Sequence, residues 1–321
     1  MVVGGGISGI ACAASLASSG IAVTVRERGR GLAGRMASRT LRDSGTAFDG
    51  RVTDIGASYF TAREPAFVDL VDRLISRGVV RPWTTAFHVA DPSGITGVST
   101  GPMRYAATRG LRSVVVALAE EADGLSIELS SEVAEVAAAG GRMTVDGSPV
   151  GGVALCLPQP QAERIAEGLP ARPPVWEPVI AVTCVFDRRR WIELDGVFVN
   201  DDPVITWIAD DGSRRGDDAP VLVAHVHPVL AARHLDAPAA VVPMAVAAVQ
   251  RVLSIQAYPD WVDAHRWTLA KPMTGREEPF WLADDRHLGL AGDAWSGGPR
   301  VEAAWLSGHR LGLELARRLS A

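Results

Sequence analysis

The sequence predicts an α/β fold in which a mainly antiparallel α+β domain is inserted into a domain built on a parallel sheet. Three observations lead to this prediction. The chain of 321 residues opens with a strand-compatible segment, a Gly-rich turn and a helical segment. It closes with the same order of elements, and its last helix begins near Val301. Between these ends, from Val179 onward, β-branched segments are separated by Asp, Gly and Pro, as in antiparallel hairpins.

The opening turn, Val2–Gly9 (VVGGGISG), fits the pattern G-x-G-x-x-G with Gly4, Gly6 and Gly9. In this pattern the first Gly permits a tight turn, the second lets the backbone approach a pyrophosphate, and the third lets the helix pack on the strand. The helix that follows, predicted at Ile7–Ser19, offers free N–H groups and a dipole that favours negative charge. The turn therefore predicts a Rossmann-type dinucleotide site.

The second strand, predicted at Ile21–Arg26, ends at Glu27, which follows Gly9 by 18 positions. An acidic residue at this place holds the hydroxyls of a ribose, because a carboxylate accepts two hydrogen bonds. The alternative is a surface charge at the end of a strand. The segment Arg28–Arg39 follows, and its four arginines predict phosphate contacts, with a solvated loop as the alternative.

Hydrophobic periodicity predicts further helices and strands along the rest of the chain. Helices are predicted at Pro65–Gly78, Leu111–Asp123 and Pro238–Leu253. Strands are predicted at Val79–Val89, Ile95–Ser99, Ser126–Val136, Met143–Val145, Gly151–Leu157, Val179–Phe186, Gly196–Asn200, Val204–Ala209, Pro220–His227 and Trp261–Leu269.

The composition is that of a globular protein, with 47% hydrophobic and 21% charged residues. The formal net charge of −5 argues against a nucleic-acid surface. Cys12, Cys156 and Cys184 stand far apart in apolar stretches, so we expect buried free thiols and no metal site. No apolar run reaches the roughly 18 residues of a membrane span. Since the Gly-rich motif stands at the start without a signal peptide, a cytoplasmic protein without membrane contact is expected.

Several stretches together resemble the renalase-like FAD-dependent oxidoreductases, a branch of the amine-oxidase-like flavoproteins. They read VVGGGISG, VRERGRGLAGRMASR, DIGASYFTAR, ALCLPQPQAERI and LAGDAWSGGPRVEAAWLSG. The resemblance implies a GR2-like, Rossmann-type FAD-binding domain formed by residues 1–78, 104–165 and 270–321. Residues 79–103 and 166–269 would form the substrate domain, where the match is mainly His265–Pro272 (HRWTLAKP).

The resemblance also implies a set of FAD contacts. Gly4, Gly6, Ser8 and Gly9 would hold the pyrophosphate, Glu27 the adenosine ribose, and Val133 the adenine through its backbone. Further cofactor contacts would come from Arg28, Arg35, Met36 and Asp293, and Ala57 and Ser58 would line the isoalloxazine ring. The last helix would begin at Arg300, Val301 and Glu302 and point at the flavin N1–O2 edge, where a helix N-terminus favours negative charge.

The chain departs from the pattern of this family at several positions. Ala33 stands where the family usually has the first Gly of G-G-R, and Ile55 and Ser58 replace a polar pair. Only Met1–Val3 precede Gly4, so the first strand is expected to be short, and the affinity for FAD is left open.

Aromatic residues are the main candidates for substrate contact, because a flat substrate stacks on flat rings. The candidates are Tyr59, Thr61, Trp207, Trp267 and Trp295. His265 and Lys271 are weak catalytic candidates; a structural hydrogen bond for the former and a surface position for the latter are favoured. His225 and His227 would share one face of a strand, and packing or a polar pocket wall is favoured over a zinc pair.

The first functional hypothesis is a renalase-like oxidase. A small substrate, such as an isomer of dihydronicotinamide, would pass a hydride to flavin N5, and O2 would reoxidise the flavin and give hydrogen peroxide. Two alternatives stay open: an amine or secondary-metabolite oxidase of the same fold, and a non-enzymatic FAD or nucleotide binder that serves as a redox sensor. No oligomeric state is predicted.

Overall fold

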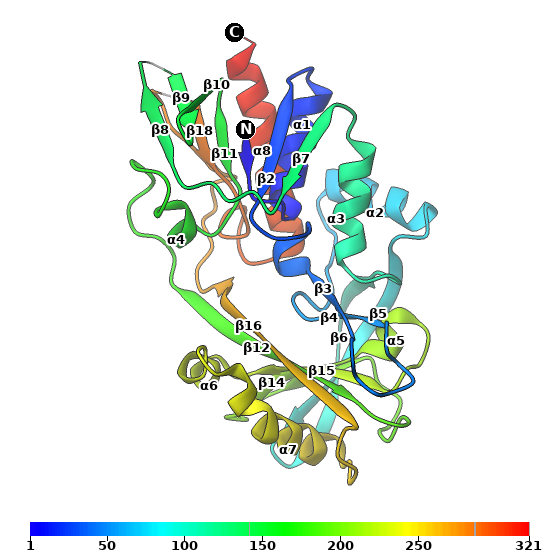
Figure 1. Ribbon diagram of the computed structural model, residues 1–321. Helices are drawn as coiled ribbons and strands as arrows, with labels where there is room; N and C mark the ends of the chain where they lie inside the picture. The colour runs from blue at the N-terminus through cyan, green and yellow to red at the C-terminus, as the bar shows by residue number, and fades with distance from the viewer. Residues whose placement is uncertain (141, 286, 321) are drawn as a thin grey trace.

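The computed structural model of the chain describes residues 1–140, 142–285 and 287–320. It contains two large sheets, drawn one above the other in Figure 1. The upper sheet has the order β17-β18-β11-β1-β2-β7. Its strands, in that order, are Trp281–Leu282, Leu288–Leu290, Val153–Leu155, Val2–Val3, Val23–Glu27 and Leu125–Leu129. All neighbours are parallel except β17 and β18, as expected for a Rossmann-type domain with one antiparallel edge strand.

Two parallel helices, α1 (Ile7–Ser18) and α8 (Val301–Leu319), pack closely against each other and the upper sheet (Figure 1). Their backbones meet at glycines. A Cβ on Gly308 would lie 1.9 Å from the carbonyl oxygen of Ser8, and one on Gly312 would lie 2.5 Å from that of Cys12. Since 308 pairs with 8 and 312 with 12, the helices run in the same direction. Two more helices, α2 (Pro65–Ser76) and α3 (Arg112–Glu121), complete this core.

The lower sheet has the order β16-β12-β15-β14-β13-β5-β6. Its strands, in that order, are Trp261–Pro272, Trp176–Val185, Val221–Val226, Ile205–Asp210, Gly196–Val199, Arg81–Asp91 and Gly94–Ala106. Only β13 and β5 are parallel neighbours. The helices α6 (Pro228–Arg233) and α7 (Val242–Leu253) cover the face turned away from the upper domain (Figure 1). The opposite face is therefore turned toward the Rossmann-type domain.

Smaller elements complete the structure. A three-stranded sheet contains β8 (Val136–Ala139), β9 (Arg142–Val145) and β10 (Ser148–Val150), and a two-stranded sheet contains β3 (Ser38–Thr40) and β4 (Val52–Asp54). The short helices are α4 (Gln159–Ala162) and α5 (Asp211–Arg215), and the 3₁₀ turns are Gly34–Met36 and Pro238–Val241.

The predicted fold class is confirmed, and the predicted long helices are found with ends shifted by a few residues. The predicted strand Ser126–Val136 is wrong as one element. It ends at Leu129, because the next residues turn back on the end of β2, where Ser131 N–H donates to the Glu27 carbonyl at 2.9 Å. Helix α5 was not predicted. The lower sheet draws on the two segments expected for the insertion, while the bounds of the two domains stay a prediction.

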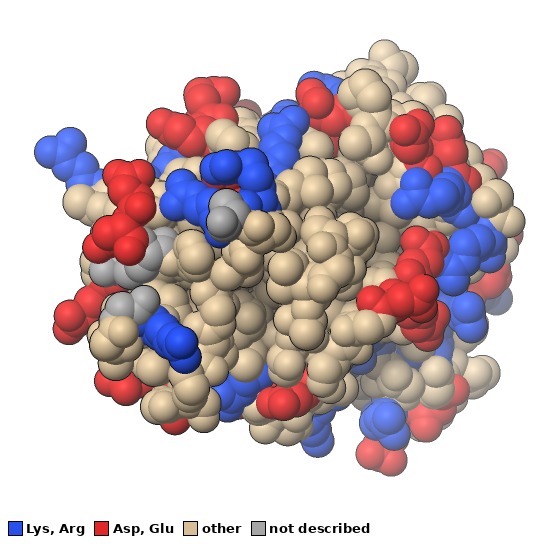
Figure 2. Space-filling view, turned by 90° about the horizontal axis from the view of Figure 1, so that it is seen from above, with Lys and Arg blue, Asp and Glu red and all other residues tan. Residues whose placement is uncertain are grey.

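The surface seen from above carries acidic and basic side chains side by side around a largely uncharged centre (Figure 2). Within the described ranges, no helix has the length and apolar character needed to cross a membrane. All three cysteines are buried and free, as predicted.

Candidate dinucleotide and substrate site

The turn between β1 and α1 shows the close approaches that its glycine pattern predicts. A Cβ on Gly9 would lie 1.9 Å from the carbonyl oxygen of Gly4, whereas one on Gly6 would meet nothing within 4 Å. No side chain caps the N-terminus of α1, and its first turn has no acidic residue. The buried Ser8 hydroxyl has no hydrogen-bond partner among the described residues. Free N–H groups, a free hydroxyl and a positive helix end together fit a pyrophosphate.

The predicted ribose and adenine contacts lie beside this turn. The Glu27 carboxylate, at the end of β2, accepts the N–H groups of Gly5 at 2.7 Å and Gly29 at 2.6 Å. The hydrogen bond from Ser131 to the Glu27 carbonyl brings the next residues to the same place, and Val133 is buried in one cluster with Val3. The backbone therefore fixes Glu27 next to the phosphate turn.

Arg35 and Asp293, two predicted cofactor residues, contact each other directly. The two terminal nitrogens of Arg35 donate to the two carboxylate oxygens of Asp293, each at 2.6 Å. Arg35 also donates to the Ala270 carbonyl at 3.1 Å and stacks over Trp176, 5.0 Å from the ring centre. This pair joins the closing segment of the chain to the Arg-rich segment.

The segment that was predicted to line the isoalloxazine packs on the same Arg35 backbone. Ala57 N–H donates to the Arg35 carbonyl at 2.9 Å. A Cβ on Gly56 would lie 2.0 Å from that oxygen, so only glycine permits the approach. Met36, also a predicted contact, is buried in the core of the upper domain.

Helix α8 runs parallel to α1 and extends beyond the N-terminus of α1. Val301 precedes Gly308 by seven positions and Ile7 precedes Ser8 by one, so α8 begins about 9 Å beyond the start of α1. The Glu302 carboxylate is buried and accepts the N–H groups of Arg63 at 2.6 Å and Glu64 at 2.8 Å. The Glu302 carboxylate therefore stabilises the start of α2, and the cofactor contact of this residue stays a prediction.

An aromatic cluster joins the upper segment to the lower sheet. It contains Tyr59, Trp83, Phe87, Phe198 and Trp207. The ring centre of Tyr59 lies 5.1 Å from that of Phe87 and 5.8 Å from that of Trp207. The Trp207 indole N–H donates to the Ser58 hydroxyl at 3.0 Å. Burial raises the pKa of Tyr59, and the nearby Arg104 guanidinium offsets part of this effect. Two predicted substrate residues, Tyr59 and Trp207, are thus brought together.

A row of side chains crosses the lower sheet on the face turned toward the upper domain. Directly paired residues on neighbouring strands share a face. The pairing places Trp207 beside His225, His225 beside Ala181, and Ala181 beside His265. Burial and the positive charge of Arg214 lower the pKa of His225 to about 4, so its ring is neutral at pH 7. The Nε2 atom of His225 has no partner in the described structure.

Strand β16, which carries His265, also carries Trp267, and the indole N–H of Trp267 donates to the Ile55 carbonyl at 2.7 Å. The Trp267 ring lies 4.7 Å from His265, and burial together with the charge of Arg39 lowers the pKa of His265. His227 is not beside His225 on the strand, because it caps α6 and accepts the Val229 N–H at 3.3 Å.

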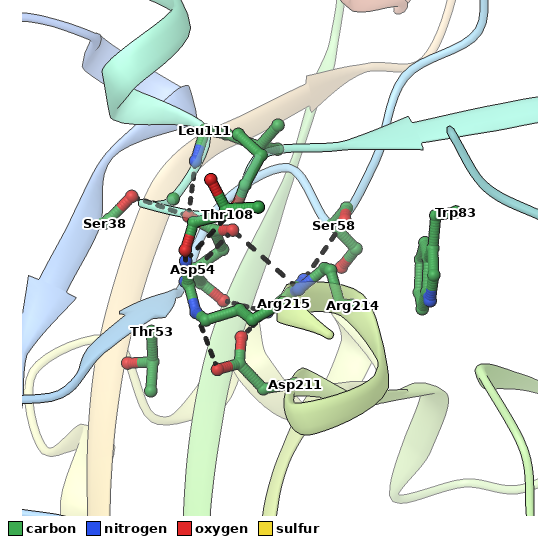
Figure 3. Close-up of polar contacts among 12 residues, drawn as sticks. Ser38, Thr53, Asp54, Ser58, Trp83, Thr108, Leu111, Asp211, Arg214 and Arg215 are labelled. Carbon is green, nitrogen blue, oxygen red and sulfur yellow. Dashed lines mark hydrogen bonds and ion pairs between the residues drawn. The ribbon is translucent and has the colours of Figure 1, made fainter. Parts of the chain in front are cut away.

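A buried ionic network lies where the two domains meet (Figure 3). Asp211 accepts hydrogen bonds from Arg51 and Arg215, at 2.9 and 3.0 Å, and from Arg214. Arg214 also donates to the carbonyls of Ser58 at 3.1 Å and Asp54 at 3.3 Å. Although burial alone would raise it, the three guanidinium groups hold the pKa of Asp211 well below its usual range. The network therefore holds the 54–58 segment from the side of the lower domain.

Sequence reasoning missed Arg104, Asp211 and Arg214. The stretch DDGSRRGDD has the composition of an exposed turn, and no periodicity indicates that its side chains are buried. For Arg104 the only signal is a single charge in a β-rich segment.

Other predicted residues lie apart from the aromatic cluster. Trp295 is buried in one cluster with Leu155 and Leu290 of the upper sheet, and the Arg276 guanidinium lies 4.7 Å from its ring centre. Trp295 thus packs in the core, and its contact with the substrate stays a prediction. Lys271 is exposed and pairs across the sheet with Glu177. Arg28 and Arg300 are exposed, and Thr61 and Val301 are half-buried. No group of three potential metal ligands occurs within the described ranges.

Known proteins match this chain at two levels, in a sequence family and in solved structures. Residues 2–74 match the family described as the NAD(P)-binding Rossmann-like domain. Over its whole length, the chain is similar to two solved oxidases. One, from Exiguobacterium sp. 255-15 and provisionally named a protoporphyrinogen oxidase, has a TM-score of 0.79 and 16% identity, with 99% of this chain and 98% of that chain covered. The other, putrescine oxidase bound to putrescine, has a TM-score of 0.72 with the same identity and coverage. These matches establish a shared fold.

Proposed function

We propose that this chain is an FAD-dependent oxidoreductase, as the renalase-like resemblance implies. The observation that carries the proposal is the pair of parallel helix N-termini, staggered by about 9 Å, at one site. The first suits a pyrophosphate. A plain NAD dehydrogenase would leave the second, together with the Arg35–Asp293 pair, without a function.

The residues present fit FAD along the whole of this path. The Ser8 hydroxyl and the α1 N–H groups would bind the pyrophosphate, and Glu27 would bind the ribose. Arg35 and Asp293 would orient the chain toward the ring. The short 56–57 segment would let the ring approach the backbone, and the N-terminus of α8 would favour negative charge at the ring edge.

When bound, FAD would supply the redox chemistry, taking a hydride from the substrate and passing two electrons to O2, which with protons gives hydrogen peroxide. The protein would bind and orient the substrate. Tyr59 and Trp207 would contact its flat face, and the neutral His225 ring would exchange a hydrogen bond with it. We propose isomers of dihydronicotinamide as the substrate class, on the strength of the resemblance.

The shared fold with putrescine oxidase supports a second candidate, an amine oxidase. An anaerobic titration of the FAD-loaded protein separates the two. We expect dihydronicotinamide isomers to bleach the visible flavin absorbance and putrescine to leave it unchanged, with peroxide formed on readmission of air. Bleaching by amines alone would favour the second candidate. Stable FAD binding without reduction by either class would reject both and leave a nucleotide-binding sensor.

A further inference from the structure

Arg104, near the end of β6, is a buried cation without a counter-ion. Arg104 is 7% exposed, and its Nη1 atom has no hydrogen-bond partner among the described residues. No carboxylate of the described chain forms an ion pair with it. The two other buried arginines of the lower domain differ, because Arg214 and Arg215 both form ion pairs with Asp211. Burying an unpaired charge is costly, so the position of Arg104 is a candidate site for an anion.

The surroundings of Arg104 are aromatic. Its guanidinium carbon lies 4.3 Å from the centre of the Phe87 ring, which in turn lies 5.1 Å from Tyr59 and 4.8 Å from Trp207. A cation stacked on a ring keeps its N–H edge available in the plane of the guanidinium. That edge can bind a carboxylate through two parallel hydrogen bonds.

Gly101 packs closely against one side of this guanidinium. A Cβ on Gly101 would lie 2.9 Å from Nη2 of Arg104, so a side chain there would collide with it. Gly101 is itself exposed, so the guanidinium lies under an exposed stretch of β6.

We propose that Arg104, supported by the fully buried Phe87 ring, forms with Tyr59 and Trp207 a binding site for an aromatic or heteroaromatic carboxylate. The flat ring of the ligand contacts the aromatic side chains, and its carboxylate pairs with Arg104. Two residues of the site, Tyr59 and Trp207, are also predicted substrate contacts, so an aromatic carboxylate bound here would compete with the proposed substrate, and this consequence rests on the proposed function. The ligand site itself does not depend on turnover.

The site also distinguishes between ligands of different charge. A guanidinium repels an ammonium group, and the buried carboxylates Asp54 and Asp211 form ion pairs with Arg214 and Arg215, not with Arg104. The site therefore favours anionic ligands over amines such as putrescine.

Calorimetric titration of the FAD-loaded protein with benzoate, benzamide and benzylamine tests the proposal, because the three probes share a ring and differ in charge. We expect benzoate to bind at least about tenfold more tightly than benzamide, and benzylamine to bind most weakly. Arg104→Met should remove the preference for benzoate, and Arg104→Lys should restore part of it. Arg190→Met, which removes an exposed arginine paired with Asp187, should leave it unchanged.

Equal binding of benzoate and benzamide by the unmodified protein would overturn the proposal, as would an Arg104→Met variant that keeps the preference. If Arg104→Met does not fold, the Arg104→Lys variant carries the test, because a shorter single-point cation should weaken benzoate and leave benzamide unchanged. A loss of both ligands in that variant would overturn the site. If the protein does not bind FAD, the proposed function fails, and the same titration without FAD still tests the site.

Discussion

The Arg35 guanidinium binds both carboxylate oxygens of Asp293 across 258 positions of sequence. Their side chains are 29% and 13% exposed, so the pair is only partly screened by water. We expect Asp293→Ala to weaken FAD binding by about tenfold or more, because it leaves Arg35 without its two-point partner. Titration of FAD fluorescence against the protein measures this. Glu314→Ala, which removes the half-buried partner of Arg317 and Arg318 at the far end of α8, is the control. Unchanged FAD affinity in Asp293→Ala would show that the pair has no part in the site.

Ala33 adopts a conformation that suits glycine. Its φ is +103° and its ψ −12°, it is buried, and its N–H donates to the Gly5 carbonyl at 2.9 Å. We expect Ala33→Gly to raise the free energy of unfolding by about 1 kcal/mol, since the strain at Cβ is removed. Chemical denaturation measures the change. Ala119→Gly within α3 should instead lower stability by about 1 kcal/mol. A destabilised Ala33→Gly protein would contradict the strained geometry.

The contact of Gly308 with Ser8 sets the spacing of α1 and α8. A methyl group at 308 would lie 1.9 Å from the Ser8 carbonyl oxygen, so the helices must separate. We expect Gly308→Ala to lower the free energy of unfolding by about 1–3 kcal/mol and to weaken FAD binding. Gly97→Ala is the control, because a Cβ there meets nothing within 4 Å. If both variants are equally stable, the close packing of the two helices is wrong.

Asp211 balances three buried or half-buried guanidinium groups. We expect Asp211→Asn to lower the free energy of unfolding by about 3–5 kcal/mol, because it leaves charges unpaired in the interior. Asp187→Asn, which removes an exposed partner of Arg190, should cost little. Since the pKa of Asp211 is lowered in the folded state, its contribution is present at neutral pH and declines as the pH falls below the ordinary range of Asp. Equal losses in the two variants would contradict the network.

His225 predicts a second pH dependence of the stability, which comes from a buried base that stays neutral and not from an acid that stays charged. Its pKa is about 4 in the folded protein, below the ordinary value of 6.5, so the unfolded chain binds the proton more readily between these values. Stability is therefore lost as the pH falls from 7 to 5, by about 2 kcal/mol from this residue. His225→Gln should reduce that loss by the same amount in denaturation experiments at the two pH values. An unchanged pH dependence in the variant would show that His225 titrates normally.

Much of the fold could be predicted because local patterns decide it. The glycine spacing at residues 4–9, the strand ending at Glu27 and the amphipathic periods of α2 and α7 are all readable in short windows. The individual residues Arg35 and Asp293 were also predicted as cofactor contacts. Their direct pairing was not, since it depends on how the closing segment returns to the first strand.

The remaining misses have the same physical origin. Asp211, Arg214 and Arg215 have the composition of a surface turn, yet burial between two domains makes them a network. Glu302 was predicted at the start of the last helix, but the hydrogen bonds from the N–H groups at the start of α2 to its carboxylate were not. The position of Trp295 in the core, under the Arg276 guanidinium, was also not predicted. Each outcome depends on a long-range contact that no local pattern contains.

The central claim is that α1 and α8 present two helix N-termini to one bound FAD. The visible absorption spectrum of the protein after incubation with FAD and removal of excess cofactor tests it most directly. We predict a bound flavin spectrum corresponding to about one FAD per chain, unchanged when NAD is added in excess. A colourless protein that binds NAD, or neither dinucleotide, would contradict the claim.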